Sequence, residues 1–353
     1  MTEGSREQPI RSEPCPNCTL CGSSGDIVYR QRRDRLFGAG GSWSIRRCAG
    51  HECGLLWLDP MPLPEDIGKA YQRYYTHEPR DQGGNTGQRV NLLRKAFRNL
   101  KRSYLATAYN YSPGRESLGV HLLGKGLSLL PLHRHEVDTW VRSLRAVRGG
   151  RLLDVGCGSG EWLAAMREFG WSVEGIDFDA EAVRAAARRG LNAFCGDLEQ
   201  RRFPDAHFDA VTLNHVLEHV PDPTRTLAEC HRILKPGGKL VIATPNTGSL
   251  SHLVFKGDWR GLEPPRHLHM FSRPSLTRAL RLAGFEDISL RAAVATSVIS
   301  DSISLWRGKQ NSAGRVETTI TQAVTSLLGL CELGLVRWKP SLSDCVGAVA
   351  VKR

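Results

Sequence analysis

Residues 151–160 have the sequence RLLDVGCGSG, in which an apolar run leads directly into Gly156, Gly158 and Gly160. Glycine lets the backbone turn sharply and approach a ligand closely, because it carries no Cβ. Apolar residues at helical spacing follow over 161–169. A strand, a Gly-rich loop and a helix in this order place a ligand at the carboxyl end of the strand, near the helix N-terminus.

The chemistry of this loop favours a cationic ligand. The dinucleotide-binding pattern Gly-x-Gly-x-x-Gly requires a third glycine at the position that Glu161 occupies here, and a carboxylate there would face a pyrophosphate. Asp154, two residues before Gly156, also suits a positive charge. S-adenosylmethionine carries an ammonium and a sulfonium and no phosphate. The alternative is a tight turn that binds nothing.

Two further acids follow predicted strands. Asp177 ends the second strand, 21 residues after Gly156, where a carboxylate can accept hydrogen bonds from both ribose hydroxyls. Asp197 ends the third strand, where it can accept a hydrogen bond from an adenine amino group. Each acid alone could cap a helix. With Asp154, acids at three successive strand ends favour a bound nucleoside.

Short apolar runs alternate with helical stretches from residue 151 onward. The predicted strands span 151–155, 172–176, 193–195, 208–213, 239–243 and 346–351. The predicted helices span 161–169, 180–189, 223–234 and 274–283. The turn residues Pro236, Gly237 and Gly238 are expected to separate the third helix from the next strand. Strands alternating with helices predict an α/β fold with a doubly wound parallel sheet.

Residues 151–290 resemble a class I S-adenosylmethionine-dependent methyltransferase, close to the ubiquinone-biosynthesis O-methyltransferases. The motifs that carry the resemblance are LLDVGCGSG, GIDFD, CGDL, FDAVTLNHVLEHVPDP and LKPGGKLVIATPN. The resemblance implies a seven-stranded Rossmann-like sheet that binds S-adenosylmethionine. Helical additions and a small N-terminal zinc-ribbon-like module would complete the chain.

The resemblance also assigns residues to the donor. The implied donor-binding residues are Asp154, Gly156, Gly158, Gly160, Asp177, Phe178, Asp197, Leu198 and Asn214. Among them, Asp154 would lie near the methionine end, Asp177 at the ribose and Asp197 at the adenine. Asn214 and the following His215 would line the methionine moiety and the acceptor side.

A hydroxyl acceptor needs a general base, and histidine is the commonest one. Two clusters compete for this role: His215 with Glu218 and His219, and His267 within the segment 263–269. We favour His267 as the base or as the residue that orients the acceptor, because this loop usually faces the acceptor in such folds. The alternative is a histidine that packs the loop and bonds the backbone.

The pair Glu218-His219 resembles a magnesium site of the quinone O-methyltransferases. That family has Glu at the position that His215 occupies here. Because of this departure we do not expect magnesium, and we expect His219 to orient the loop after the fourth strand.

Cysteines are spaced for a metal near the N-terminus. Cys18-x2-Cys21 and the pair Cys48 and Cys53 form two knuckles, with a glycine directly behind two of the four residues. Four sulfurs in this arrangement suit tetrahedral structural zinc. The predicted ligands are Cys18, Cys21, Cys48 and Cys53, with Cys15 and His51 as spare candidates. The following residues 54–62 resemble the segment after a zinc knuckle in bacterial methyltransferases.

The formal net charge is +12, and residues 80–148 carry 13 Lys or Arg against 4 Asp or Glu. A local basic surface suggests an anionic partner, and the alternative is a solvated Arg-rich helix face. The predicted segments are 1–14, a disordered tail; 15–75, the zinc-binding module; 76–148, a basic helical linker or lid; 149–295, the core; and 296–353, a helical insertion with the final strand.

The longest apolar run, 320–336, is 17 residues long and falls short of the roughly 20 that a spanning helix needs. It favours a buried helix, or a helix that lies on a membrane and presents a lipid-linked acceptor. Cytoplasm is the expected compartment, and there the ten cysteines should be thiols or metal ligands.

These observations favour a methyltransferase acting on a small-molecule, glycan or lipid-linked acceptor, most simply at oxygen. Nucleic-acid methylation is the second reading, which the zinc module and the basic segment motivate. The interleaved aromatics of a single-strand platform are missing from the sequence, so it is not favoured. A non-catalytic binding protein of the same fold is the third, and the intact loop with three acids argues against it.

Overall fold

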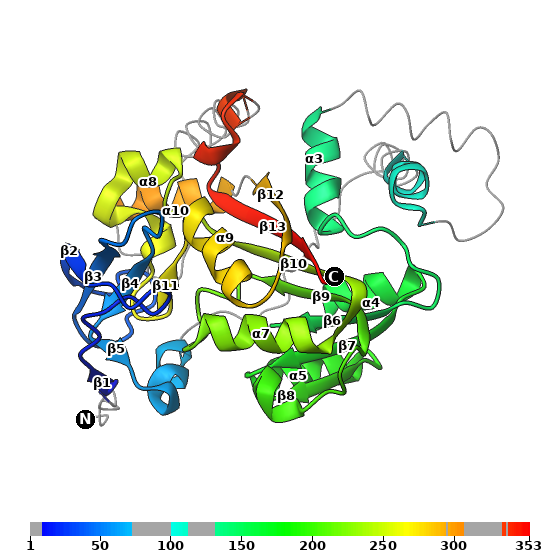
Figure 1. Ribbon diagram of the computed structural model, residues 1–353, viewed down its shortest axis with the longest axis horizontal. Helices are drawn as coiled ribbons and strands as arrows, with labels where there is room; N and C mark the ends of the chain where they lie inside the picture. Colours follow the sequence, from blue (N-terminus) through cyan, green and yellow to red (C-terminus); the bar gives the residue numbers. More distant parts are fainter. Residues whose placement is uncertain (1–8, 73–99, 112–130, 294–295, 307–333, 337) are drawn as a thin grey trace, which may run out of the picture. The chain divides into compact units, whose positions relative to one another are not determined.

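The computed structural model describes residues 9–72, 100–111, 131–293, 296–306, 334–336 and 338–353 (Figure 1). The chain divides into two compact units. Unit 1 comprises Met1–Tyr75, Leu213–Arg232 and Ile242–Arg353, and unit 2 comprises Thr76–Thr212 and Ile233–Val241. Residues 76–99 and 112–130 of the predicted basic linker and most of the apolar run 320–336 lie outside the described residues.

A seven-stranded sheet has the strand order β12-β13-β10-β9-β6-β7-β8. Its strands are β6 (Arg151–Val155), β7 (Ser172–Asp177), β8 (Asn192–Cys195), β9 (Phe208–Asn214), β10 (Leu234–Pro245), β12 (Asp287–Ala293) and β13 (Cys345–Val351). Strands β6, β7 and β8 are parallel neighbours, whereas β12 and β13 pair antiparallel. The predicted α/β class with a doubly wound, mostly parallel sheet is confirmed.

Unit 2 contains helix α3 (Pro131–Trp140), which precedes β6, and three helices that follow the parallel strands. They are α4 (Glu161–Glu168) after β6, α5 (Ala180–Arg188) after β7 and α6 (Leu198–Arg201) after β8. Helix α4 buries Leu163 and Met166, and α5 buries the small Ala182 and Ala186. The side chain of Asp179 caps α5 by accepting a hydrogen bond from the backbone N–H of Glu181 at 2.8 Å.

The end of helix α7 (Pro223–Ile233) differs from the sequence prediction. Strand β10 begins directly afterwards, at Leu234, so the predicted turn at 236–238 lies inside the strand. Leu234 is fully buried, and Lys235 pairs with Asp209 of β9 at 2.7 Å, which holds the chain in the sheet before the glycines. Gly237 has a φ of 76° and absorbs the bend there.

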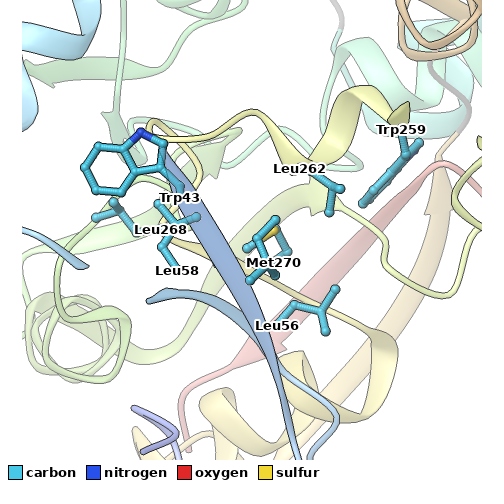
Figure 2. Packing of buried hydrophobic residues seen from close by; sticks show 8 residues of the cluster. Trp43, Leu56, Leu58, Trp259, Leu262, Leu268 and Met270 are labelled. Atoms are coloured by element: carbon cyan, nitrogen blue, oxygen red, sulfur yellow. The ribbon is translucent and has the colours of Figure 1, made fainter. Parts of the chain in front are cut away.

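Unit 1 contains a second sheet with the order β11-β4-β3-β2. Its strands are β2 (Gly25–Arg32), β3 (Trp43–Cys48), β4 (Leu56–Asp59) and β11 (His269–Met270). One apolar cluster joins side chains of both sequence regions: Trp43, Ile45, Leu56, Leu58, Trp259, Leu262, Leu268 and Met270 (Figure 2). The N-terminal sheet therefore packs on the segment that carries His267.

Part of the predicted disordered tail is ordered. Strand β1 (Ser12–Glu13) pairs antiparallel with β5 (Met61–Pro62). Arg11 explains this order, because its backbone N–H and its guanidinium both donate to the carboxylate of Asp66, at 2.8 and 2.9 Å. Asp66 lies in the 3-10 helix η1 (Pro64–Tyr71).

The remaining helices of unit 1 are α8 (Leu250–Phe255), α9 (Arg273–Leu282) and α10 (Thr296–Trp306), with the 3-10 helices η2 (Lys256–Asp258), η3 (Arg260–Leu262) and η4 (Pro340–Leu342). A capping box between Ser272 and Ser275 starts α9. Helix α10 is one part of the helical insertion predicted over 296–342. Among the described residues, none of the helices has the length and apolarity needed to cross a membrane.

Candidate functional site

The glycine loop, Gly156 to Gly160, follows β6 in unit 2. Gly156, Gly158 and Gly160 have φ values of 72°, 54° and 75°, a conformation that glycine adopts without strain. The backbone N–H of Gly156 donates to the carbonyl of Ile176 at 2.8 Å and ties the loop to β7. A Cβ on Gly158 would meet open space, whereas a Cβ on Gly160 would lie 2.4 Å from Cδ1 of Leu191. The loop is thus packed on one side and open on the other.

Asp177, the last residue of β7, faces this loop. One of its carboxylate oxygens accepts the backbone N–H of Gly158 at 2.8 Å, and the other accepts that of Asp179 at 3.0 Å. The residue is 8% exposed, and burial raises its pKa while the two backbone donors oppose the shift. Each oxygen can accept a further hydrogen bond, so the carboxylate can still receive hydroxyl donors.

Asp154 is surrounded by unit 2 side chains that sequence analysis did not connect with it. Its carboxylate pairs with the Arg142 guanidinium and accepts a hydrogen bond from the Thr212 hydroxyl at 2.6 Å. Arg142 also lies over the ring of Trp162, at 3.6 Å from its centroid. Burial raises the pKa of Asp154, and Arg142 and Thr212 act against this rise. The charge at the end of β6 is therefore already compensated by an arginine.

The third predicted acid lies close to the second. Strand β8 pairs with β7 so that Cys195 is opposite Asp177, and the backbone N–H of Gly196 donates to the Asp177 carbonyl at 3.0 Å. Asp197 follows and is exposed; its carboxylate accepts a hydrogen bond from the Gln200 side chain at 2.7 Å. The neighbouring Leu198 is buried.

Two other predicted donor residues are accessible. Phe178, directly after Asp177 in unit 2, is 55% exposed. Asn214 ends β9, belongs to unit 1 and is exposed.

Comparison with known proteins identifies the family. The model of a methyltransferase domain family matches residues 133–290. The ubiquinone biosynthesis O-methyltransferase of Ralstonia nicotianae is 34% identical over 175 residues, which cover 44% of this chain and 73% of the relative. The chain belongs to the class I S-adenosylmethionine-dependent methyltransferases.

The same name is given to relatives that align over a smaller part. The methyltransferase of Paracidovorax citrulli is 35% identical over 132 residues, 34% of this chain and 56% of the relative. That of Xanthomonas oryzae pv. oryzae is 43% identical over 105 residues, which cover 28% of this chain and 44% of the relative. This methyltransferase thus spans about half the length of these two relatives. Among solved structures, a SAM-dependent methyltransferase from Archaeoglobus fulgidus has 22% identity, covers 64% of this chain and 94% of its own, and has a TM-score of 0.42.

Histidines and a glutamate gather in unit 1 of the methyltransferase. His215 has a φ of 56°, and its Nδ1 lies 3.2 Å from Oε1 of Glu218. The side chain of Glu218 is buried, whereas that of His215 is 42% exposed. Burial alone would lower the pKa of His215. The neighbouring Cys345 and Glu218 outweigh this effect and raise the pKa well above its ordinary value. Burial raises the pKa of Glu218, and the adjacent His215 lowers it, to about 2.

The imidazole rings of His219 and His267 contact each other, with centroids 4.7 Å apart and planes inclined at 63°. Nδ1 of His219 lies 2.9 Å from the carbonyl oxygen of Arg266, and Nδ1 of His267 lies 2.7 Å from that of Gly261. Burial lowers the pKa of both imidazoles, for His267 well below the ordinary value. His267, the favoured base, is only 5% exposed.

A buried ionic network supports the loop that carries His267. The Arg266 guanidinium is fully buried and pairs with Glu263 at 2.7 Å and with Asp34 at 2.9 Å. The hydroxyl oxygen of Tyr71 in η1 lies 2.9 Å from Nδ1 of His219. Asp34, Arg266 and Tyr71 were not predicted: Asp34 is 232 residues from Arg266 and Tyr71 is 148 residues from His219, so no local pattern marks these two contacts.

The four predicted zinc ligands converge. One ligand atom each from Cys18, Cys21, Cys48 and Cys53 lies within 4.8 Å of the others. The sulfur atoms of Cys18 and Cys53 are 3.7 Å apart, and those of Cys21 and Cys48 are 3.3 Å apart. Zinc–sulfur bonds of about 2.3 Å in a tetrahedron separate the sulfurs by roughly 3.8 Å. The donor set and its spacing therefore fit one zinc ion.

Two glycines shape the loops that bring the four thiols together. Gly22 and Gly54, directly after Cys21 and Cys53, have φ values of 72° and 61°, which turns each loop back on itself. Burial raises the pKa of Cys53 to about 11, whereas hydrogen bonds with Ser23 outweigh burial at Cys21 and lower its pKa to about 6. The spare candidates lie outside this cluster: the Cys15 thiol faces the Asn17 carbonyl at 3.7 Å, and His51 is exposed.

Proposed function

We propose that this chain transfers the methyl group of S-adenosylmethionine to a hydroxyl oxygen of a small-molecule acceptor. The observation that carries the proposal is the direct hydrogen bond between the Asp177 carboxylate and the backbone of Gly158, at 2.8 Å, beside an open face of the glycine loop. Backbone that approaches a ligand without side chains and a carboxylate at the adjacent strand end suit a cationic nucleoside.

In this proposal the residues of unit 2 divide the donor between them. Asp177 accepts hydrogen bonds from the ribose hydroxyls, and the exposed ring of Phe178 packs beside it. Asp197 accepts a hydrogen bond from the adenine amino group, and Leu198 lies beside the adenine ring. The backbone of the three glycines lies along the donor. Asp154 does not contact the donor; it pairs with Arg142 and so holds the loop in place.

The bound donor supplies a methyl group on a sulfonium, which is displaced by the acceptor oxygen. A hydroxyl must lose its proton during this step, so a positioned base accelerates it. We propose His215 as this base, because its side chain is partly exposed and its Nδ1 lies 3.2 Å from Oε1 of the buried Glu218, which can hold the imidazole in one orientation. His267 is proposed to orient the acceptor instead, since its imidazole is almost fully buried.

The acceptor class is inferred from the relatives, which are named for O-methylation in ubiquinone biosynthesis. A ring hydroxyl of a small molecule is therefore the first acceptor to test. Glycan and lipid-linked hydroxyls belong to the same chemical class and are the next acceptors in that screen.

We further propose that Cys18, Cys21, Cys48 and Cys53 bind a structural zinc ion. The four thiols lie within 4.8 Å of one another, and Cys48 ends strand β3 of the N-terminal sheet, whose side chains pack on residues 259–270. Such a centre requires reduced thiols, which supports the cytoplasm as the proposed compartment. Metal analysis of the purified chain tests it, and a chain with intact thiols and no metal at this centre would contradict it.

Calorimetric titration of S-adenosylmethionine tests the donor site. We expect the wild type to bind and Asp177→Ala to lose about 1.5–3 kcal/mol of binding energy, roughly 10- to 100-fold in affinity, because the hydrogen bonds from the ribose end on a charged acceptor. Glu168→Ala, which changes an exposed residue at the far end of α4, is the control and should bind within about twofold. Equal affinity of wild type and Asp177→Ala would contradict the ribose role.

The pH profile tests His215. Because Cys345 and Glu218 raise the pKa of His215 well above its ordinary value, kcat/KM should rise as the pH increases through that raised pKa. His215→Gln should flatten this limb and leave donor binding unchanged. A profile in His215→Gln that still rises like the wild type would show that another group accepts the proton.

A further inference from the structure

A pocket lined by arginines lies in unit 1 and contains none of the residues assigned to the methyl donor. It is formed by the end of β2 and the residues after it, by η2 and η3, and by the end of α10. Its lining includes four arginines, one aspartate and one tryptophan: Arg32, Arg33, Arg35, Arg260, Asp258 and Trp259. We call it the arginine pocket. We propose that it binds the phosphate group of a phosphorylated acceptor.

Three arginines at the end of β2 carry the accessible charge of the pocket. The side chains of Arg32 and Arg35 are 29% and 34% exposed. Arg33 is exposed and forms no ion pair with any described residue. The partly exposed carboxylate of Asp258 opposes these three charges. Because guanidinium groups stay protonated in proteins, the mouth of the pocket has an excess of positive charge.

The other two acids that line the pocket are buried and paired. The side chains of Asp34 and Glu263 are 2% and 3% exposed. Both pair with the fully buried Arg266, at 2.9 and 2.7 Å, and Glu263 also pairs with Arg260. Their charges are therefore compensated within the protein and do not cancel those of the exposed arginines.

Arg32 and Arg35 are held in place and still have N–H groups to donate. Nη2 of Arg32 and Nη1 of Arg35 donate to the same oxygen of Asp258, at 2.9 and 2.6 Å. Arg32 also donates to the carbonyl of Gly257, and Arg35 to that of Leu305. Their Nε atoms donate to no atom of the described residues. Guanidiniums fixed in this way suit a phosphate, which accepts parallel N–H bonds from arginine.

The indole of Trp259 is a hydrogen-bond donor without an acceptor. In the part of the chain that the structure describes, this residue is 1% exposed and its Nε1 has no hydrogen-bond partner. An indole nitrogen only donates, and a buried donor that lacks an acceptor is unfavourable. Since Trp259 forms part of the pocket wall, a phosphate oxygen in the pocket would offer an acceptor to it.

The size of the arginine pocket favours a small anion. Its cavity volume is about 30 Å³, whereas a single water needs about 10–15 Å³ on the same measure. The enclosed part therefore has room for one tetrahedral group, and the rest of the ligand lies outside it. A phosphate has more acceptor oxygens than a carboxylate and can use more of the arginine N–H groups.

Glu263 connects the arginine pocket with the proposed acceptor side. Its carboxylate lines the pocket, and its Oε2 lies 3.4 Å from Nε2 of His267, the residue proposed to orient the acceptor. A ligand whose phosphate lies in the pocket is thereby placed near His267. The assignment of the phosphate to the acceptor rests on the methyl transfer proposed above, whereas phosphate binding itself does not.

Calorimetric titration of the full chain with inorganic phosphate, at constant ionic strength and without methyl donor, tests the pocket. We expect saturable binding of one equivalent. Arg33→Gln and Arg35→Gln should each weaken it about tenfold or more, because each removes a charged hydrogen bond to the anion. Arg281→Gln is the matched control: this arginine of α9 is also exposed, belongs to the same unit and does not line the pocket, so affinity should stay within about twofold.

A second titration, with phenyl phosphate, distinguishes the source of the phosphate. A phosphomonoester should bind at least as tightly as inorganic phosphate, and the same two arginine variants should weaken it. Binding of inorganic phosphate together with exclusion of phenyl phosphate would overturn the assignment to an acceptor.

Three outcomes would overturn phosphate binding at the pocket. One is a wild type that shows no saturable binding. Another is an unchanged affinity in Arg33→Gln, which alters an exposed, unpaired side chain and should fold even if Arg35→Gln does not. The third is an equal loss in Arg281→Gln, which would indicate a general effect of charge. A chain that binds phosphate but no S-adenosylmethionine would contradict the proposed methyl transfer and leave the phosphate site standing.

Discussion

Replacement of Arg142 by methionine should strongly destabilise unit 2. Asp154 is 1% exposed, and the side chain of Arg142 is 13% exposed, so the pair is nearly removed from water. Removing one partner of a buried pair costs about 3–5 kcal/mol, because the remaining charge has no counterion. The Thr212 hydroxyl, at 2.6 Å, offsets only part of this cost. We therefore expect Arg142→Met to lower the free energy of unfolding by about 3–5 kcal/mol at pH 7.

The effect should depend on pH with a defined sign. Burial raises the pKa of Asp154, and Arg142 opposes this rise, so the variant should have a folded-state pKa further above the unfolded value of about 4. A carboxyl whose folded pKa is raised loses stability as the pH rises from its unfolded pKa to its folded pKa, at up to about 1.4 kcal/mol per pH unit. The deficit of Arg142→Met should thus be smaller at pH 5 than at pH 7.

Urea unfolding followed by circular dichroism at pH 5 and pH 7 measures these differences. Arg142→Met/Asp154→Asn removes both charges and should recover most of the loss. Arg145→Met alters an exposed arginine three residues away and should stay within about 0.5 kcal/mol of the wild type. A loss below about 1 kcal/mol in Arg142→Met, or a double variant that is less stable than the single one, would refute the reasoning.

Three further predictions follow from other parts of the chain. Gly160→Val should lower the free energy of unfolding by at least about 2 kcal/mol, because φ is 75° and the new Cβ would lie 2.4 Å from Cδ1 of Leu191. Thermal unfolding measures this loss, and Gly158→Ala, whose Cβ meets open space, is the comparison. His269 is fully buried, and burial lowers its pKa to about 4, whereas the unfolded form titrates near 6.5. The free energy of unfolding of the wild type should therefore fall by about 3 kcal/mol as the pH decreases from 6.5 to 4. An unchanged pH dependence of stability in His269→Gln would contradict this. Cys48→Ser should release the proposed zinc and lower the melting temperature of unit 1 in calorimetry, whereas Cys230→Ser, a thiol outside the cysteine cluster, should keep it.

The sheet and the conformation of the glycine loop could be predicted because their signals are local. An apolar strand, three glycines and a helix lie within a few residues of one another, and Asp177 and Asp197 follow strands whose parallel pairing brings their ends together. The spacing of the cysteine knuckles is a similar short-range pattern, and the structure brings these four thiols to one point.

The turn at Pro236–Gly238 was wrong because the tertiary structure outweighed the local preference. Leu234 is fully buried and Lys235 pairs with Asp209 across strands, which extends β10 through the glycines. Turn propensity is only a local tendency. A pair formed with the neighbouring strand is not visible in the segment itself.

The surroundings of the proposed catalytic residues could not be derived for the same reason. Asp34 and Arg266 are separated by 232 residues, and Tyr71 and His219 by 148. The addition of β11 to the N-terminal sheet likewise rests on pairing between His269 and Trp57. Sequence reasoning recognised the cysteine module and the histidine loop separately, and their packing around Trp43 and Leu268 links them (Figure 2).

The donor site can be tested most directly by a crystal structure of the chain grown with S-adenosylhomocysteine. The ribose hydroxyls should lie within about 3 Å of the Asp177 carboxylate, and the nucleoside should run along Gly156 to Gly160 with its adenine towards Asp197. Density for the compound at another place, or a glycine loop closed over by side chains, would contradict the account.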